Sequence, residues 1–382
     1  MYREPCKIES ETIEIHAAYV AWIFACAAAN MMVRQRNVAC RWESACDSSL
    51  ANWNVGRHKL LDKCNNRLRR TDSIGIINTA YGNGRRSRKE RLSRMKTLTR
   101  NAYAKVNLAL DVLRRREDGY HDVCMIMQNL SLYDTLTFTM EEADALTITL
   151  SCDKEFVPCD EKNLVYKAVA LMGKTYHLTG KIHVDITKRI PVEAGMAGGS
   201  TDCAAAFHAM RELYGLDVTT AELMKLGVTL GADVPYCILA KTALSEGIGE
   251  VLTEVAPLPD CYVVVAKPKV SVSTKMVYEN LHANELEHHP DVAGMVDALK
   301  LGNLAGVADR MENVLETVTT KLYPQIEEIK QTMKEAGAEN AIMSGSGPTV
   351  FGLYTGREAA ELAAGKIRQQ YGLSEVYVTQ PC

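Results

Sequence analysis

The charge balance of the chain reverses near residue 95, and this break constrains what can fold together. Residues 1–94 hold 17 Lys and Arg against 9 Asp and Glu, whereas residues 95–382 hold 27 against 38. All three tryptophans and five of the twelve cysteines lie in the first segment, but only one of the eleven prolines does. Segments with such different statistics are not expected to form one folding unit, so the functional core is expected in residues 95–382.

The first segment, residues 1–94, is open to three interpretations. Its apolar run 17–33 is at the lower limit of about 17 residues for a membrane span, and the acidic residues before it are unlike a secretory signal. Residues 57–94 are rich in arginine and lack apolar periodicity, which is typical of disorder. The segment is therefore a weak membrane anchor, a buried or functionless helix with a disordered extension, or not part of the native polypeptide. We favour the last interpretation.

A chain that begins at Met95 is expected to fold and to keep the kcat and KM of the full chain, because every candidate functional residue lies after Met95. Parallel assays of the two chains would check this. An inactive short chain beside an active full-length chain would show that residues 1–94 pack on the core.

The overall composition excludes several classes of protein. A net charge of −3 argues against general binding of nucleic acids, which requires a basic surface. The cysteines are scattered and form no C-x-x-C pair, so neither a zinc site nor a disulfide scaffold is indicated. Free thiols in a reducing compartment are expected, which favours a cytoplasmic protein without a membrane partner.

Periodicity in residues 95–382 predicts strands and helices in two units that divide near residue 257. Strands are expected at 102–111, 120–138 with a break near Asp134, 146–150, 181–186, 262–268, 340–345, 349–354 and 376–380. Helices are expected at 163–176, 203–215, 220–230, 291–299, 303–319, 324–336 and 357–371. This order predicts an enzyme of the α/β or α+β class.

The stretch PVEAGMAGGST, residues 191–201, is the most informative part of the sequence. Gly195, Gly198 and Gly199 let the backbone approach a ligand, and Ser200 and Thr201 are suited to cap the helix that follows. The first N–H groups of a helix attract phosphate. The spacing is not that of a P-loop, and taken alone the stretch is equally well explained as a tight turn.

Other candidates are weaker when each is taken alone. Lys105 lies on the polar face of the first strand, where a lysine is usually solvated, and Asp233 in GADVP is typical of a turn. Gly345 and Gly347 of MSGSGPT would leave N–H groups free for an anion, or would form an ordinary loop. Tyr120 in DGYH would stack on a base, or would be a half-buried hairpin residue.

The order of these motifs closely resembles that of the GHMP kinases, small-molecule kinases that use ATP. The motifs are AYAKVN, DGYH, PVEAGMAGGSTD, LGADVP and MSGSGPT, and the resemblance covers nearly all of residues 96–382. REDGYHDV and VSVSTKMVY further resemble the members that phosphorylate a cytidyl substrate. The implied fold is α+β, with an S5-like ATP-binding domain at 95–256 and a ferredoxin-like α/β domain at 257–382.

The resemblance also assigns roles to residues. The implied catalytic pair is Lys105 and Asp233, and the substrate-binding residues are Asn107, Tyr120, His121 and Tyr278, with Tyr120 and Tyr278 as opposite walls around the cytosine. The residues implied to bind ATP are Pro191, Val192, Glu193, Ala194, Gly195, Met196, Ala197, Gly198, Gly199, Ser200 and Thr201, with Asn163 near the adenine. Mg²⁺ is implied as cofactor, with Ser200 as a candidate ligand.

Departures from the family pattern are confined to loops. Ala240 and Lys241 stand where many members have glycines, and Ile248 stands where arginine is common. Residues 1–94 match nothing in the family. The alternatives are another GHMP kinase, for homoserine, mevalonate or galactose, and a GHMP-fold sensor that binds nucleotide without turnover.

Overall fold

The computed structural model describes residues 95–382, so the interpretations of residues 1–94 lie outside the described residues. The strands are β1 (Lys96–Arg115), β2 (His121–Glu141), β3 (Leu146–Cys152), β4 (Gly180–Thr187), β5 (Ala243–Glu246), β6 (Val251–Glu254), β7 (Tyr262–Ala266), β8 (Glu312–Asn313), β9 (Asn340–Met343), β10 (Val350–Tyr354) and β11 (Val376–Thr379). The helices are α3 (Leu164–Tyr176), α4 (Gly198–Tyr214), α5 (Thr220–Gly227), α6 (Val234–Leu239), α7 (Thr274–Asn280), α8 (Val292–Lys300), α9 (Leu304–Ala308), α10 (Glu316–Leu322), α11 (Gln325–Glu335) and α12 (Arg357–Tyr371), with a 3₁₀ turn at Ala283–Glu285.

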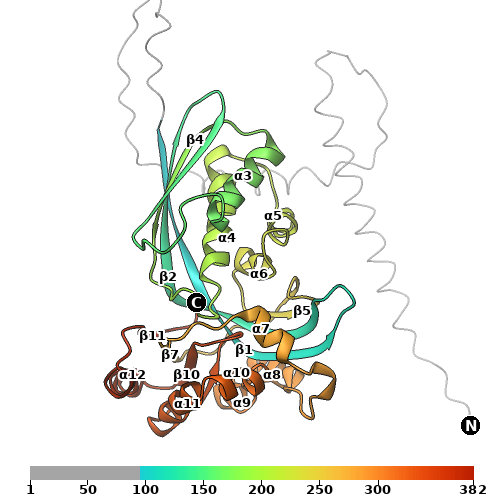
Figure 1. The fold of residues 1–382 in the computed structure, drawn as a ribbon, viewed down its shortest axis with the longest axis vertical. Coiled ribbons are helices and arrows are strands. Elements are labelled where there is room, and N and C mark those ends of the chain that lie inside the picture. Colours follow the sequence, from blue (N-terminus) through green and yellow to red (C-terminus); the bar gives the residue numbers. More distant parts are fainter. Residues whose placement is uncertain (1–94) are drawn as a thin grey trace, which may run out of the picture. The chain divides into compact units, whose positions relative to one another are not determined.

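Two sheets organise the fold. The first has seven strands, in the order β3-β4-β2-β1-β8 with β5 and β6 branching from β2, and the second has four in the order β11-β7-β10-β9. Helices α3 and α4 cover one face of the first sheet, and α11 and α12 pack on the second (Figure 1). The predicted α+β class is confirmed.

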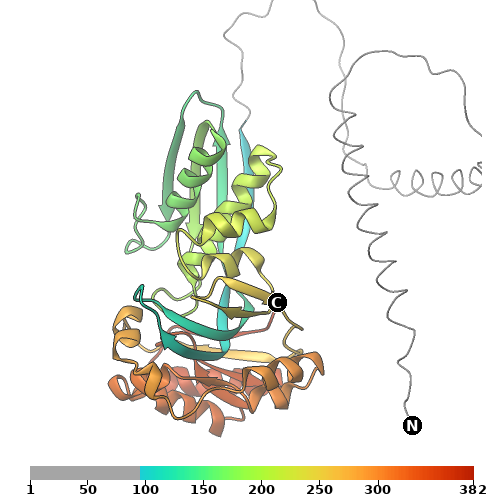
Figure 2. The same cartoon turned by 90° about the vertical axis from the view of Figure 1, so that its right-hand side faces the viewer.

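The hairpin of β1 and β2 runs through both halves of the described chain. Its first part lies beside α4, and its second part turns to run along the layer that contains β7 and β10 (Figure 2). Three register shifts interrupt the hairpin, at Tyr103/Lys105, Asn107/Ala109 and Val112/Arg114. Such irregularities bend a strand and redirect its side chains.

Both faces of β1 are buried in the middle of the strand, although its alternating sequence suggested one polar face. Every residue from Ala104 to Val112 is buried, including Lys105, Asn107 and Asp111. One hydrophobic cluster contains Val106 and Leu108 of β1 together with strands β7, β9 and β10 of the second sheet. The polar side chains of β1 therefore lie between layers, where they require partners inside the protein.

The segment 303–319 is not the single helix that its spacing predicts. It contains α9, then β8, then α10, and β8 pairs in parallel with β1 through Ala109 with Glu312 and Leu110 with Asn313. β8 joins the first sheet although it lies beyond the division expected near residue 257. None of the helices between residues 95 and 382 is both long enough and apolar enough to cross a membrane.

Candidate functional site

Lys105 lies at the first register shift of β1, and it is 4% exposed rather than solvated. Its backbone N–H donates to the carbonyl of Met196, at 3.2 Å, which ties β1 to the glycine-rich loop. Its Nζ donates to Asn107 Oδ1 at 2.7 Å and lies 3.7 Å from Asp233 Oδ2. The strand thus holds a buried ammonium between an amide oxygen and a carboxylate.

Asp233 comes immediately before α6, but its side chain makes no capping hydrogen bond to the helix. The side chain is 35% exposed, so the carboxylate is accessible from solvent while it faces Lys105. The fold therefore brings together the two residues predicted as the catalytic pair. A carboxylate beside a fixed ammonium, open on one side, can accept a proton from a ligand.

Buried polar side chains of α4 and α6 lie next to Lys105 and Asp233. Thr201 Oγ1 donates to the carbonyl of Tyr103 at 2.8 Å, one turn into α4. Cys237 of α6 is buried, and burial, together with the charge of Asp233, raises the pKa of its thiol well above the ordinary value. Cys237 therefore stays protonated and does not compete with Asp233 as a base.

In the glycine-rich loop, which leads into α4, every second residue from 193 to 197 has a positive φ. Glu193, Gly195 and Ala197 have φ of 53°, 70° and 56°, in the left-handed region that non-glycine residues adopt only at a cost. Ala197 is the N-cap of α4 and provides no side-chain hydrogen bond. The prediction that Ser200 and Thr201 cap the helix is wrong, because both lie inside its first turn. The start of α4 is left without a side-chain cap, as is suitable for an anionic ligand.

The loop at 344–349 meets the glycine-rich loop directly. Ser344 Oγ donates to the carbonyl of Gly195 at 3.0 Å, and a Cβ placed on Gly195 would lie only 2.1 Å from the carbonyl oxygen of Ser344. Glycine is therefore required at position 195 by both close approach and positive φ. The N–H of Gly347 donates to Ser344 within the loop, so it is not free for an anion as the sequence suggested.

Asn163 is the N-cap of α3. Its Oδ1 accepts the N–H of Val165 at 2.8 Å, and its Nδ2 donates to the carbonyl of Pro158 at 2.7 Å. The next residue, Leu164, reaches within 3.7 Å of a Cβ placed on Gly199. Asn163 thus stands beside the glycine-rich loop, but its side chain is committed to capping the helix.

A buried ionic cluster beneath the glycine-rich loop was missed in the sequence. Lys188 Nζ contacts Asp134 Oδ2 and also donates to Asp202 Oδ2 at 2.7 Å. It lies 3.3 Å from the position of a Cβ on Gly198. The Oδ1 of Asp134 accepts the N–H groups of Arg189 and Ile190. β2 is one strand through Asp134, but its pairing with β1 shifts between Asn129 and Tyr133, close to the predicted break. A charged residue in the middle of a buried strand was the available signal.

The cluster makes stability depend on pH through Asp202. Burial, opposed by Lys188 and reinforced by Asp134, raises the pKa of Asp202 to about 7. An unfolded aspartate has a pKa of about 3.9, so the native chain binds this proton more tightly than the unfolded chain does. The resulting stabilisation is complete below about pH 4, declines as the pH rises from about 4 to 7, and is lost above that range.

Asp202→Asn should therefore remove this decline. We expect the free energy of unfolding of the variant, measured in urea between pH 5 and 8, to fall less with rising pH than that of the unmodified chain. Asp185→Asn is the control, because hydrogen bonds from Ser151 and His183 lower the pKa of Asp185. Equal pH slopes for Asp202→Asn and the unmodified chain would contradict the assignment.

The DGYH hairpin reaches α7 through His121. The rings of His121 and Tyr278 are 5.2 Å apart between centroids and tilted by 44°, so no base fits between these two rings as they stand. Burial and the nearby Arg115 lower the pKa of His121, which favours a neutral imidazole at pH 7. Burial, with the charge of Asp233, raises the pKa of Tyr278. Tyr120, next to His121, is 58% exposed.

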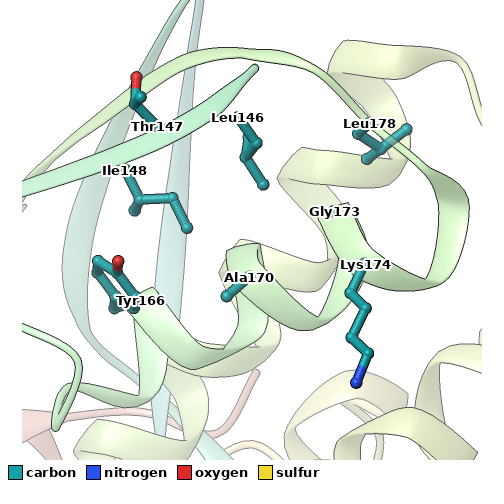
Figure 3. A pocket seen from close by; sticks show the side chains of 8 residues that line it. All are labelled: Leu146, Thr147, Ile148, Tyr166, Ala170, Gly173, Lys174 and Leu178. Atoms are coloured by element: carbon teal, nitrogen blue, oxygen red, sulfur yellow. The ribbon is translucent and has the colours of Figure 1, made fainter.

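A separate open pocket of about 600 Å³ lies between β3 and α3 (Figure 3). Its walls combine apolar side chains, such as Leu146 and Ile148 from β3, with the polar Thr147, Tyr166 and Lys174. Neither element carries Lys105 or Asp233, so this pocket is distinct from the site described above.

Comparison with known proteins agrees with this geometry. The family described as GHMP kinases N terminal domain matches residues 163–241, and GHMP kinases C terminal matches residues 295–373. These segments contain the glycine-rich loop and Asp233, and the loop at 344–349.

Relatives that align with most of the described chain are named as kinases of a cytidyl substrate. The 4-diphosphocytidyl-2-C-methyl-D-erythritol kinase of Lachnospira eligens is 50% identical over 75% of this chain and 99% of its own length. The protein of the same name from Lachnoclostridium phytofermentans is 50% identical over 70% of this chain and 92% of its own length. A crystal structure of 4-(cytidine 5'-diphospho)-2C-methyl-D-erythritol kinase is 32% identical, with a TM-score of 0.64 over 74% of this chain and 99% of that one. The chain therefore belongs to the 4-diphosphocytidyl-2-C-methyl-D-erythritol kinases, a family of GHMP kinases.

Proposed function

We propose that the chain transfers the γ-phosphate of ATP to the C2 hydroxyl of 4-diphosphocytidyl-2-C-methyl-D-erythritol, a step of the non-mevalonate isoprenoid pathway. The observation that carries this proposal is the buried Nζ of Lys105, 3.7 Å from Asp233 Oδ2, at a site where two glycine-rich loops meet. The names of the relatives supply the substrate. A sensor that binds nucleotide without turnover would not need this pair.

In the proposed mechanism Asp233 accepts the proton of the hydroxyl as its oxygen attacks the γ-phosphorus in line. The new P–O bond forms as the bond to the β-phosphate oxygen breaks, and ADP leaves. Lys105 holds the hydroxyl in register with Asp233 and offsets negative charge in the transition state. Asn107 accepts a hydrogen bond from Lys105 and so fixes the direction of the ammonium.

The ATP phosphates are proposed to lie against residues 191–201 and the uncapped start of α4, with the adenine near Asn163. The side chains of Ala194 and Met196 are buried in a hydrophobic cluster, so these residues would contribute only backbone groups. The close approach of Gly198 to Lys188 and Ile190, at 3.3 Å for an added Cβ, fits a loop whose backbone faces the ligand.

Mg²⁺ is proposed as the cofactor. No cluster of three or more His, Cys, Asp or Glu side chains within residues 95–382 could hold a metal ion. The donor set therefore fits an ion held mainly by phosphate oxygens, with the hydroxyl of Ser200 as the protein ligand, since Mg²⁺ often binds through substrate phosphates with few protein groups. When bound, the ion neutralises charge on the phosphates.

The cytosine is proposed to bind at the DGYH hairpin, with Tyr120 stacking on one face and Tyr278 on the other. Since the rings of His121 and Tyr278 are in contact, the base would not lie between them. It would stack on the face of Tyr278 that is turned away from His121. A neutral imidazole can both donate and accept a hydrogen bond at the edge of the base. Hydrogen bonds of this kind would reject uracil, whose O4 and N3–H invert the pattern of cytosine.

Tyr120→Ala should raise KM for the cytidyl substrate by about 5- to 150-fold, the equivalent of one lost stacking contact. KM for ATP should be almost unchanged, and steady-state kinetics with each substrate varied in turn would measure both. Tyr133→Ala is the control, because Tyr133 is also exposed but packs on Tyr103. An equal rise in KM for ATP would show that Tyr120 does not lie at the cytosine.

The decisive experiment is an ATP-consumption assay with the cytidyl substrate. The uridine analogue tests base recognition, and homoserine, mevalonate and galactose test the other GHMP kinase activities. We expect turnover with the cytidyl substrate alone. Preferred turnover of one of the other alcohols would overturn the proposed substrate, and ATP binding without any turnover would support the sensor alternative.

A further inference from the structure

Asn313 connects the strand that carries Lys105 to the loop at 344–349. It is 3% exposed and lies in β8, where it pairs with Leu110 of β1. The next residue, Val314, donates its N–H to the carbonyl of Leu110 at 3.0 Å. The backbone of Asn313 is therefore fixed to β1 five residues beyond Lys105.

The side chain of Asn313 donates hydrogen bonds to two backbone carbonyl groups at the start of the loop at 344–349. Its Nδ2 donates to the carbonyl of Met343 at 2.8 Å and to the carbonyl of Gly345 at 2.8 Å. Its Oδ1 accepts the N–H of Leu315 at 3.0 Å. Both N–H bonds and the carbonyl oxygen of the side-chain amide thus have partners inside the protein, as expected for a buried amide that fixes its neighbours.

Because the peptide unit is planar, hydrogen bonds that fix these two carbonyl groups also fix the directions of the N–H groups in the same peptide units. In a trans peptide the C=O of one residue and the N–H of the next point in opposite directions. Turning the carbonyl of Gly345 toward Asn313 therefore turns the N–H of Ser346 away from it. The same relation turns the N–H of Ser344 away from Asn313, where it donates to the carbonyl of Thr349 at 2.8 Å.

The loop is held from a second side by the glycine-rich loop, through the contact of Ser344 with Gly195. Glu316, just after Asn313, accepts the N–H of Met343 at 2.6 Å and is held by Lys330. The loop at 344–349 is thus fixed between α10, β1 and the residues proposed to hold the triphosphate. Buried, fully bonded networks of this kind orient the groups that touch a ligand.

We propose that Asn313 is a positioning residue for ATP. It sets the distance between β1 and the loop at 344–349, so that the N–H of Ser346 and the ammonium of Lys105 face the same triphosphate. Asn313 itself does not contact the nucleotide. The inference rests on the proposed function, because it takes ATP as the ligand of both loops.

Asn313→Asp and Asn313→Ala test the proposal, with Asn340→Asp as a matched control. Asn340, at the other end of β9, also donates through Nδ2 to two carbonyls, those of Ala308 at 2.7 Å and Met311 at 3.5 Å. Its Oδ1 likewise accepts a backbone N–H, that of Ala341 at 2.8 Å. The control therefore loses the same kind of bonds away from the loop at 344–349.

The readouts are the dissociation constant for ATP, measured by calorimetry between pH 6 and 8.5, and the free energy of unfolding in urea. We expect Asn313→Asp to weaken ATP binding at pH 8.5 on the order of 10- to 100-fold, as is typical when a supporting hydrogen bond is removed. Asn340→Asp should stay within about 3-fold of the unmodified chain, since residues on which no ligand depends act mainly on stability.

The pH profile separates positioning from a general structural loss. At low pH the introduced carboxyl is protonated and can donate one hydrogen bond to a loop carbonyl. The deficit of Asn313→Asp relative to the unmodified chain should therefore shrink as the pH falls, whereas the deficit of Asn313→Ala should not change with pH.

Equal losses of ATP affinity in Asn313→Asp and Asn340→Asp would overturn the inference, as would unchanged ATP affinity in Asn313→Ala. ATP binding is measured without the second substrate, so this result does not depend on the identity of the phosphorylated alcohol. A chain that binds ATP but does not turn over the cytidyl substrate would refute the proposed function, while the Asn313 comparison would still be decided.

Discussion

Asp233→Asn should bind ATP normally and turn over about 10²–10⁴-fold more slowly than the unmodified chain, the usual effect of losing a general base. The substitution preserves volume and leaves α6 intact, because the Asp233 side chain makes no capping hydrogen bond. The amide cannot accept the proton of the attacking hydroxyl. Single-turnover phosphoryl transfer, measured at saturating concentrations of both substrates, isolates this step.

Asp217→Asn is the control for Asp233→Asn, because Asp217 is an exposed aspartate in the loop between α4 and α5. It should leave the rate unchanged. If Asp233→Asn keeps a rate close to that of the unmodified chain, Asp233 is not the base, and proton removal contributes little to this phosphoryl transfer.

Lys105→Met should lower kcat by about 10²–10³-fold, comparable to the loss of one preorganised donor in a site that excludes water. Methionine retains much of the length of the side chain but leaves Asn107 Oδ1 and Asp233 without their cationic partner. Because the ammonium acts on charge that develops in the transition state, kcat should fall more than KM rises. Steady-state kinetics in both substrates measure this division.

Lys267→Met controls for the loss of a partly buried ion pair. The Nζ of Lys267 lies 3.4 Å from Glu375, and its side chain is 12% exposed. The two lysine variants should lose similar stability in urea, while only Lys105→Met loses the catalytic rate. Comparable kcat values for the two variants would remove Lys105 from the catalytic pair.

The elements that bring Lys105 and Asp233 together follow from local sequence signals. The strand around Lys105 has an apolar alternation, and Asp233 lies in a short loop between helices that glycine and proline delimit. The order of these motifs along the chain was sufficient to identify the family. Lys105 comes within 3.7 Å of Asp233 at a register shift, however, and the alternating pattern does not reveal that shift.

The segment 303–319 shows why the rest could not be predicted. Leu304, Val307, Met311, Leu315 and Val318 recur at helical spacing, so local periodicity favours one helix. In the fold, Glu312 and Asn313 instead pair with β1, a strand some 200 positions earlier. A non-local partner overrides helical propensity here, and no local pattern records which partner that is.

The prediction for the start of α4 was wrong for a related reason. Ser200 and Thr201 are good capping residues, and a helix beginning after them is the usual expectation. The helix begins at Gly198 instead, and Thr201 Oγ1 donates to the backbone carbonyl of Tyr103 rather than capping the helix. A contact with a distant strand determined the role of a residue that local rules assign to a cap.

The β1–β2 hairpin bends as it passes from one half of the described chain to the other (Figure 1), and Lys105 lies at the first of its register shifts. β1 residues on both sides of Lys105 are buried in each of the two hydrophobic clusters, so we expect loosening of either cluster to disturb the position of the ammonium relative to Asp233. We therefore expect the catalytic rate to respond to substitutions along the strand, including at positions far from any ligand. Evolution of this enzyme toward greater heat tolerance would have to stabilise both clusters together. Stabilising one cluster alone would still let loosening of the other move the lysine.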